Sequence, residues 1–234
     1  MNAHCERTCE SCKLKESGFL CHLTPAAAME FESIKSSCFY PAGSTLFLEN
    51  EPAKGIFLLC SGKVKLSVSS RGGKTLILQL ARPGEILGLS ASMSGVAYEV
   101  SAEILHPSKV VFIRREDFLQ FVARFPEVYQ AVTRQLNVQY ARACEQLRTV
   151  GLSTSANEKV ARLFLDWSSE EPRTSEYAQI KMALTHEQIA ECVGSTRETI
   201  TRTLSEFKNK HLVTLKGTTV TIPSRSALLA VCGE

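Results

Sequence analysis

The sequence lacks several features that would assign it to a particular class of protein. No apolar run approaches the roughly 18 residues that a membrane-spanning helix needs, and charges and cysteines interrupt the first 30 residues, where a secretion signal would lie. The net charge is only +3, too small by itself to indicate a nucleic-acid partner. These absences predict a soluble cytoplasmic protein without a membrane partner.

Catalytic motifs are missing as well. The chain contains no Gly-x-Ser-x-Gly, no phosphate-binding P-loop, no Gly-x-Gly-x-x-Gly and no His-Glu-x-x-His. It also lacks internal repeats and low-complexity segments. We therefore expect a protein that is not an enzyme.

The nine cysteines are the first unusual feature that is present. Cytosolic thiols are kept reduced, which argues against a disulfide framework. Cys5, Cys9, Cys12 and Cys21 form a C-x3-C-x2-C-x8-C pattern, and four thiolates at such spacing can enclose an iron–sulfur cluster or a tetrahedral zinc ion. A redox disulfide and plain structural thiols are the alternatives. A haem held by His22 or His106 is a further one.

The chain of 234 residues is long enough for two domains. Its first half contains short, β-branched-rich segments separated by glycines, the pattern of an antiparallel sandwich or barrel. The predicted strands are Ser44–Leu48, Gly55–Leu59, Lys63–Ser67, Thr75–Leu80, Val100–Ile104 and Lys109–Ile113.

After Pro126 the apolar residues recur every three or four positions, which predicts one long helix with a coiled-coil-like seam. A symmetric parallel partner helix would bury such a seam, so we expect a homodimer. Packing of the seam against the sandwich alone is the alternative. The predicted seam residues are Tyr129, Val132, Leu136, Tyr140, Ala143, Leu147 and Val150.

The polar run Gly151–Asn157 can end that helix and cap the next one. Beyond it we expect a helix at Glu158–Trp167, a short helix at Thr185–Cys192, a turn at Val193–Thr196 and a helix at Arg197–Lys208, followed by a β-hairpin. This order is a winged helix-turn-helix. The predicted domains are a cysteine-rich segment 1–24, a sensor domain 25–125, a dimerisation helix 126–153 and a DNA-binding domain 154–234.

The helix beginning at Arg197 has the residues of a DNA-reading helix. Arg197, Glu198 and Arg202 lie on one face, while Ile200 and Leu204 point to the other. Arginine can donate two hydrogen bonds to guanine, and a carboxylate can accept one from the cytosine amino group. Residues 194–225 hold six basic side chains against two acidic ones. A solvated helix with surface Arg/Glu pairs is the alternative.

Other polar residues nearby are candidates for the DNA backbone. Lysines at the end of the reading helix and beyond it would contact phosphates and make binding salt-dependent. Thr196, Thr199 and Thr201 could reach phosphates or a thymine methyl group. The predicted phosphate contacts are Thr185, Ser195, Thr196, Thr199, Thr201, Lys208 and Lys216.

The segment Thr185–Leu204, THEQIAECVGSTRETITRTL, resembles the helix-turn-helix of the cyclic-AMP receptor protein and FNR family, and the likeness covers nearly the whole chain. It implies an α+β protein: an N-terminal double-stranded β-helix, or jelly roll, then a long dimerisation helix and a winged helix-turn-helix. Arg197, Glu198 and Arg202 match the base-reading positions of the cyclic-AMP receptor branch. The resemblance thus implies a homodimer on a palindrome of GTGA-like half-sites in double-stranded DNA, with RNA polymerase as a partner.

The resemblance also bears on the signal. Leu89 falls where the family's glutamate holds the ribose, and the arginine that binds the cyclic phosphate would fall near Tyr98, so cyclic AMP is not expected in the usual mode. Arg71, Lys74 and Arg82 leave another anion open, or are solvated hairpin charges.

Iron–sulfur members of the FNR branch also place three or four cysteines ahead of the jelly roll. Here the gap before the last cysteine is longer, and their distant cysteine ligand falls near Val111. Cys5, Cys38 or Cys60 could replace that ligand. We predict a DNA-binding regulator whose signal is redox or oxygen through the N-terminal cysteines, with a small-ligand-binding signalling module as the alternative.

Overall fold

The computed structural model describes residues 23–168, 176–181 and 184–233. The chain forms two compact units, and the division falls inside one helix, between Arg142 and Ala143. Unit 1 contains the described residues up to Ser70 together with Leu78–Arg142. Unit 2 contains Arg71–Ile77 and the described residues from Ala143 onward.

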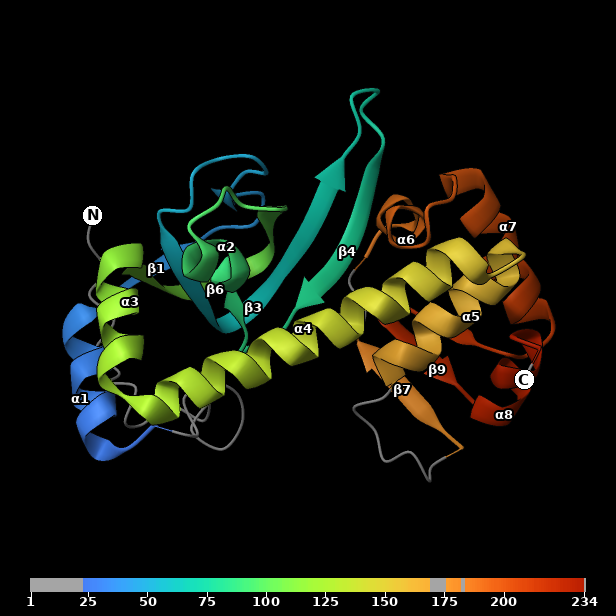
Figure 1. The fold of residues 1–234 in the computed structure, drawn as a ribbon. Coiled ribbons are helices and arrows are strands. Elements are labelled where there is room, and N and C mark those ends of the chain that lie inside the picture. The colour runs from blue at the N-terminus through green and yellow to red at the C-terminus, as the bar shows by residue number, and fades with distance from the viewer. Residues whose placement is uncertain (1–22, 169–175, 182–183, 234) are drawn as a thin grey trace. The chain divides into compact units, whose positions relative to one another are not determined.

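Unit 1 is built on a six-stranded sheet (Figure 1). Its main strand order is β1-β6-β3-β4, and β6 pairs in antiparallel fashion with β1, β2 and β3. The strands are β1 (Ser36–Tyr40), β2 (Thr45–Phe47), β3 (Gly55–Ser69), β4 (Thr75–Ala81), β5 (Ile86–Leu87) and β6 (Ser101–Arg114). The predicted β-rich N-terminal domain is confirmed.

The central strands β3 and β6 are buried on both faces. On β3, Ile56 and Leu58 belong to one apolar cluster, whereas Phe57 and Leu59 belong to a second. This division follows from the two-residue period of a strand, which turns successive side chains to opposite faces. The apolar runs in the sequence therefore form a two-sided core.

These two strands are longer than the sequence predicted. Gly55–Leu59 and Lys63–Ser67 are parts of β3, and Val100–Ile104 and Lys109–Ile113 overlap or lie within β6. The expected break between Leu59 and Lys63 was wrong: Gly62, one of the glycines expected to separate strands, lies inside β3 at a register shift with φ of 95°. A Cβ there would lie 2.1 Å from the Ser108 hydroxyl oxygen, so glycine allows an irregularity within a continuous strand.

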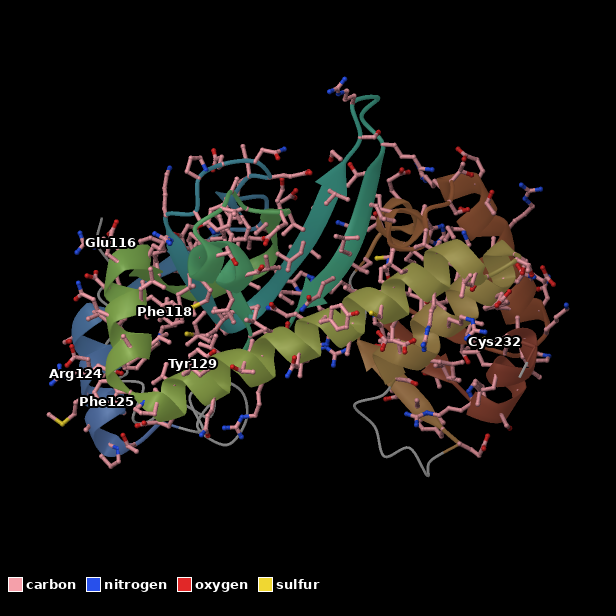
Figure 2. All side chains as sticks on the ribbon, viewed as in Figure 1. Glu116, Phe118, Arg124, Phe125, Tyr129 and Cys232 are labelled. Carbon is pink, nitrogen blue, oxygen red and sulfur yellow. The ribbon has the colours of Figure 1, made fainter. Side chains whose placement is uncertain are left out.

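Three further helices belong to unit 1 and were not predicted from the sequence: α1 (Pro25–Ile34), α2 (Leu89–Ser94) and α3 (Arg115–Arg124). Thr24 caps α1 by accepting a hydrogen bond from the Ala27 amide. Figure 2 labels Phe118 and Arg124 on α3. Phe118 is fully buried, and Arg124 forms an ion pair with Glu30 of α1 at 3.0 Å. Helices α1 and α3 contribute buried residues to one of the two apolar clusters, and α2 contributes to both.

The long helix α4 runs without interruption over Pro126–Leu152 (Figure 1), which confirms the predicted helix. Its proline stands at the start, where the missing amide proton costs nothing. Val128, Ala131 and Val132 are buried in unit 1. Within the described part of the chain, no helix is long and apolar enough to span a membrane.

Unit 2 has the elements of the predicted winged helix-turn-helix. The Ser155 hydroxyl caps the first helix by accepting from the Glu158 amide at 3.1 Å, and the three strands form an antiparallel sheet in the order β7-β9-β8. The elements are α5 (Ala156–Trp167), β7 (Ala178–Lys181), α6 (His186–Val193), α7 (Arg197–Asn209), β8 (Thr214–Lys216), β9 (Thr219–Ile222) and α8 (Arg225–Val231).

Candidate nucleic-acid interface

The first helix of the helix-turn-helix is closed by a reciprocal cap. The Thr185 hydroxyl accepts from the Gln188 amide at 3.1 Å, and the Gln188 side chain accepts from the Thr185 amide at 2.9 Å. Both bonds satisfy amides that have no partner inside the helix. Because its hydroxyl oxygen is engaged in this way, Thr185 acts first as the cap that fixes where α6 begins.

The turn between α6 and α7 depends on Gly194. Its φ of 63° is in the left-handed region, which residues with a Cβ adopt at a cost. Its amide donates to Ala190, as does the amide of Ser195 at 3.0 Å. The helix therefore ends within one residue and the chain turns at once into α7.

The second helix, α7, has one buried and one exposed face. Its N-cap is Thr196, whose hydroxyl accepts from the Thr199 amide at 3.3 Å. Ile200, Leu204 and Phe207 are buried, as the sequence predicted for the first two. The spacing of three and four residues places these apolar side chains on one side, and the opposite side is left for solvent or a ligand.

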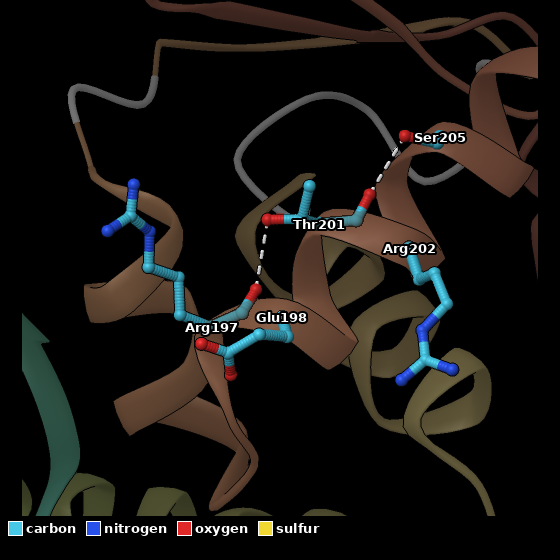
Figure 3. A pocket seen from close by; sticks show the side chains of 5 residues that line it. All are labelled: Arg197, Glu198, Thr201, Arg202 and Ser205. Atoms are coloured by element: carbon cyan, nitrogen blue, oxygen red, sulfur yellow. Dashed lines mark hydrogen bonds between the residues drawn. The ribbon is translucent and has the colours of Figure 1, made fainter.

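The exposed face of α7 forms a shallow hollow that brings the three predicted base-reading residues together. Figure 3 shows that Thr201 and Ser205 line the hollow as well. The set is Arg197, Glu198, Thr201, Arg202 and Ser205. Two guanidinium groups, one carboxylate and two small polar residues can thus meet a nucleic-acid groove from one surface.

The Glu198 carboxyl is held in its charged form. Its own backbone amide, the Thr196 hydroxyl and the nearby Arg197 together lower the pKa of this carboxyl below its ordinary value. An ionised carboxylate only accepts hydrogen bonds, and therefore suits a base amino group rather than a phosphate. The hollow thus offers acceptor and donor side chains near one another.

The predicted backbone contacts lie at the start of α6, in the turn that leads to α7, on α7 itself and at the end of β8. Thr185 and Thr196 are the caps of α6 and α7, and Ser195 and Thr199 lie at the same turn. Lys208 is exposed in the last turn of α7, and Lys216 is exposed at the end of β8, next to the turn at Gly217. All seven predicted residues belong to unit 2.

Two residues of the site were missed from the sequence. Ser205 lines the hollow, and the His186 ring on α6 lies 2.9 Å from the Thr201 hydroxyl. Ser205 follows Thr201 by one helical turn, a spacing that could have indicated it. Nothing in the sequence indicated His186, because its contact depends on how α6 packs against α7.

In unit 1, Leu89 and Tyr98 are both in the core, with exposed fractions of 1% and 2%. The Tyr98 ring stacks on Phe47 at 4.1 Å. Its hydroxyl donates to the Gly55 carbonyl at 2.7 Å and accepts from the Lys54 and Gly55 amides. Burial raises the pKa of this phenol, although its backbone hydrogen bonds oppose the change.

The candidate anion-binding charges belong to different units: Arg71 and Lys74 to unit 2, and Arg82 to unit 1. Arg71 and Lys74 are exposed in the turn that links β3 to β4, and Arg82 follows β4. The hollow on α7 remains the site where the predicted functional side chains converge.

The N-terminal cysteines Cys5, Cys9, Cys12 and Cys21, together with His22, lie outside the described residues. Among the described residues, no group of three or more His, Cys, Asp or Glu side chains is placed to hold a metal ion. Cys38 is exposed on β1, and Cys60 is half-buried on β3. Val111, where the resemblance places a distant ligand, is buried in the core.

The predicted seam of α4 is corrected at one position. Tyr129, Tyr140 and Leu147 are exposed at 59%, 73% and 72%, whereas Val132 is 2% exposed and packs inside unit 1. Leu136 packs partly against the same cluster. Val132 faces the apolar cluster of unit 1 because a helix packed on a domain must bury one stripe there, and the exposed stripe lies beside it.

Comparisons with known proteins match both units. The family model of the cyclic nucleotide-binding domain matches residues 38–125, and that of the Crp-like helix-turn-helix domain matches residues 158–231. The first match covers most of the β-rich part of unit 1. The second extends from α5 to α8 and includes the hollow.

Curated relatives match this chain over most of its length and most of their own. The CRP-like cAMP-activated global transcriptional regulator of Mycobacterium tuberculosis is 25% identical over 92% of this chain and 96% of that protein. The transcriptional activatory protein AadR of Rhodopseudomonas palustris is 27% identical over 95% and 93%. The solved structure of FixK2 from Bradyrhizobium japonicum has a TM-score of 0.75 at 20% identity, over 85% of this chain and 97% of that one, which shows the shared fold.

Proposed function

This chain belongs to the CRP/FNR family of transcription regulators, and from that premise we propose that it is a homodimer that reads a palindrome of GTGA-like half-sites. The observation that carries the proposal is the hollow on α7, which presents Arg197, Glu198 and Arg202 together. Two arginines suit the two guanines of GTGA, and the carboxylate suits the amino group of a paired cytosine. The relatives named above are regulators rather than enzymes.

Fluorescence anisotropy on a labelled palindrome tests the base-reading role. Arg202→Ala should weaken binding to the GTGA palindrome by about 1–3 kcal/mol and relax the preference for one guanine. Lys208→Ala is the matched control: it should weaken binding to all sequences alike and lower the salt slope by about 1. If the wild-type affinity is unchanged when the guanines are replaced, the proposed base-reading role is disproved.

The exposed stripe on α4 supports the homodimer. A two-fold palindrome requires two recognition helices about 34 Å apart, one turn of DNA, and a symmetric dimer provides that spacing. Tyr129, Tyr140 and Leu147 are large side chains that water would otherwise surround.

A regulator of this kind would act in the cytoplasm and contact RNA polymerase. Pull-down of polymerase on a promoter fragment by the DNA-bound dimer tests that partner.

We propose further that the protein senses a redox or oxygen signal through an iron–sulfur cluster bound by Cys5, Cys9, Cys12 and Cys21. A zinc ion bound by these cysteines is the alternative. A cluster takes four thiolates, so an additional ligand would take the place of Cys5, and Cys60 is the best candidate for it. It packs against the same apolar cluster as Val111 and Leu23, the first described residue, whereas Cys38 is exposed. Leu23, which follows the N-terminal cysteines in the sequence, thus packs against the same apolar cluster as Cys60 of β3.

Metal analysis of protein purified without oxygen tests this input. Iron and sulfide should be bound, and their content should fall in Cys9→Ser, Cys12→Ser and Cys60→Ser but not in Cys38→Ser or Cys144→Ser. Zinc without sulfide would favour the alternative, and neither element would exclude both. Loss of iron in Cys38→Ser instead of Cys60→Ser would reverse the assignment of the additional ligand.

We also propose that cyclic AMP in the family's usual mode is not the signal. Leu89 and Tyr98 stand where the ribose and phosphate contacts are expected, and both are buried in the core. A cyclic phosphate without a cationic partner would lose its strongest interaction. Titration calorimetry should detect no binding of cyclic AMP, and DNA affinity should not change when it is added. Saturable binding would favour the alternative of a nucleotide-responsive module.

A further inference from the structure

The centre of the exposed face of α7 is formed by small residues. Arg197, Thr201 and Ser205 follow one another at intervals of four positions, so they form one row along the helix. Glu198 and Arg202 form the adjacent row. All five line the hollow, and Thr201 therefore lies between the two arginine side chains that the proposed function assigns to guanines.

The hydroxyl of Thr201 is already engaged inside the protein. It donates to the Arg197 carbonyl at 3.0 Å, a bond that Figure 3 shows as a dashed line. Its oxygen also lies 2.9 Å from Nδ1 of His186. Because a hydroxyl has one proton and that proton is given to Arg197, the imidazole must donate here and the Thr201 oxygen accepts.

These two bonds fix the rotamer of Thr201 and decide which of its groups is available. The hydroxyl is hydrogen-bonded to Arg197 of its own helix and to His186 of α6. The apolar methyl group is therefore the part of the side chain that is left for a contact with DNA. Ser205 is similar in that its hydroxyl donates to the Thr201 carbonyl at 2.9 Å, but it has no methyl group. Thr201 thus offers the hollow an apolar contact between two cationic side chains.

In the major groove, the apolar group that distinguishes one base pair from another is the 5-methyl of thymine. We propose that Thr201 is a specificity-determining residue that reads this methyl group through its own, and that His186 is the positioning residue that holds it in place. The inference rests on the proposed function, and it assigns Thr201 to base reading instead of phosphate contact. Because Thr201 lies between the two arginines that are assigned to guanines, it should contact the thymine that lies between the two guanines of GTGA.

Replacing thymine by deoxyuridine tests the proposal, because it removes only the 5-methyl. The DNA is a palindrome selected from random sequence by the full-length wild-type protein, with each half-site thymine replaced in turn. At one thymine the wild type should lose about fourfold in affinity, the factor expected for one buried methyl group. A loss at no thymine would overturn the proposal.

Substitutions at Thr201 separate its methyl from its hydroxyl. Thr201→Ser removes the methyl, so it should bind the thymine site about fourfold more weakly and lose the preference over deoxyuridine. Thr201→Val keeps a methyl in place and should keep the preference. Thr218→Ala, at an exposed threonine outside the hollow, is the control and should also keep it. The opposite pattern, in which Thr201→Val loses the preference and Thr201→Ser keeps it, would show that the hydroxyl reads the base.

The thymine preference also separates positioning by His186 from a general structural role. His186→Ala should reduce the ratio of thymine to deoxyuridine affinity in the wild type, but leave it unchanged in Thr201→Val, whose side chain makes no bond to the ring. An equal loss in both backgrounds would overturn the role of His186. A wild-type protein that selects no sequence would refute the proposed function and this inference together, whereas selection without any thymine preference refutes only the inference.

Discussion

At the scale of single residues, Tyr98 shows how one side chain closes the interior of unit 1. The ring stacks on Phe47, and its hydroxyl serves both the amide and the carbonyl of Gly55. Gly88 leaves room for it, since a Cβ there would lie 2.6 Å from the ring. Tyr98 thus joins α2, β2 and β3 by contacts that a smaller residue could not make.

Tyr98→Phe should destabilise unit 1 by about 1–3 kcal/mol, because the buried carbonyl and amide of Gly55 lose a hydrogen-bond partner. Urea unfolding followed by near-ultraviolet circular dichroism measures the change. The pKa of Tyr98 is raised above 10.0 by burial, so its contribution is complete below pH 10 and is lost as the pH rises through the folded-state pKa. The difference between wild type and variant should therefore shrink in strong alkali. A gap that widens there would contradict the buried hydrogen-bonded phenol.

At the scale of elements, capping residues decide where the reading helices begin. Thr185, Thr196 and Ser155 each accept a hydrogen bond from an amide in the first turn of a helix. These bonds fix the start of each helix to within a residue, and with it the rotation of α7 that exposes its reading face.

Thr185→Ala should lower the stability of unit 2 by about 1 kcal/mol, because the capping box of α6 is lost. The protein has one tryptophan, Trp167 of α5, so its fluorescence during urea unfolding reports on unit 2. Thr218→Ala, at an exposed threonine in the turn of the β8–β9 hairpin, is the control and should change stability little. Equal effects of the two substitutions would mean that the cap contributes nothing.

The exposed stripe of α4 belongs to the same scale. Leu147→Glu should convert the dimer to a monomer in sedimentation velocity, because a charge would be buried in a symmetric contact. Ala141→Glu adds the same charge at an exposed position about 120° away around the helix from Leu147, and should leave the dimer intact. Dissociation by both variants alike would argue against a contact confined to this stripe.

At the scale of the whole molecule, a cluster of polar residues joins α4 to the β-rich part of unit 1 near the end of that unit. Glu85 is 8% exposed and accepts from Gln79 of β4 and from Arg142 of α4. Gln139 donates to the Ile86 carbonyl at 2.9 Å. Arg142 is also the last residue of unit 1, so this cluster joins α4 to the β-rich part at the end of that unit.

Arg142→Ala should leave Glu85 short of its charged partner, and the loss should be about 1–2 kcal/mol because the arginine side chain is 40% exposed. Hydrogen exchange of the α4 amides around residue 142 should then become faster. Arg134→Ala, at an exposed arginine of the same helix, should leave that exchange unchanged. Exchange that is the same in both variants would show that the cluster does not hold the helix.

The sequence was informative wherever the signal is local. The long helix after Pro126, the turn at Gly194 and the helix with Arg197 and Glu198 follow from periodicity, capping and turn residues, which act between neighbours in the chain. Glycine misled where tertiary contacts override local preference: Gly62 resembles a turn, but it accommodates the Ser108 side chain within a continuous strand. Likewise, Val132 is buried because it packs against residues of unit 1 that are distant from it in the sequence.

The sequence alone determined that this protein has a sensor-like β-rich unit, a long helix and a reading helix with two arginines and a glutamate. Tertiary structure decided which atoms those elements present. Only the packing of α6 on α7 brings His186 to Thr201, and only the folding of the sheet places Tyr98 on Gly55. The physical reason is the range of the interactions: propensity and capping act within one helical turn, whereas these contacts close over many residues and form only after the core has packed.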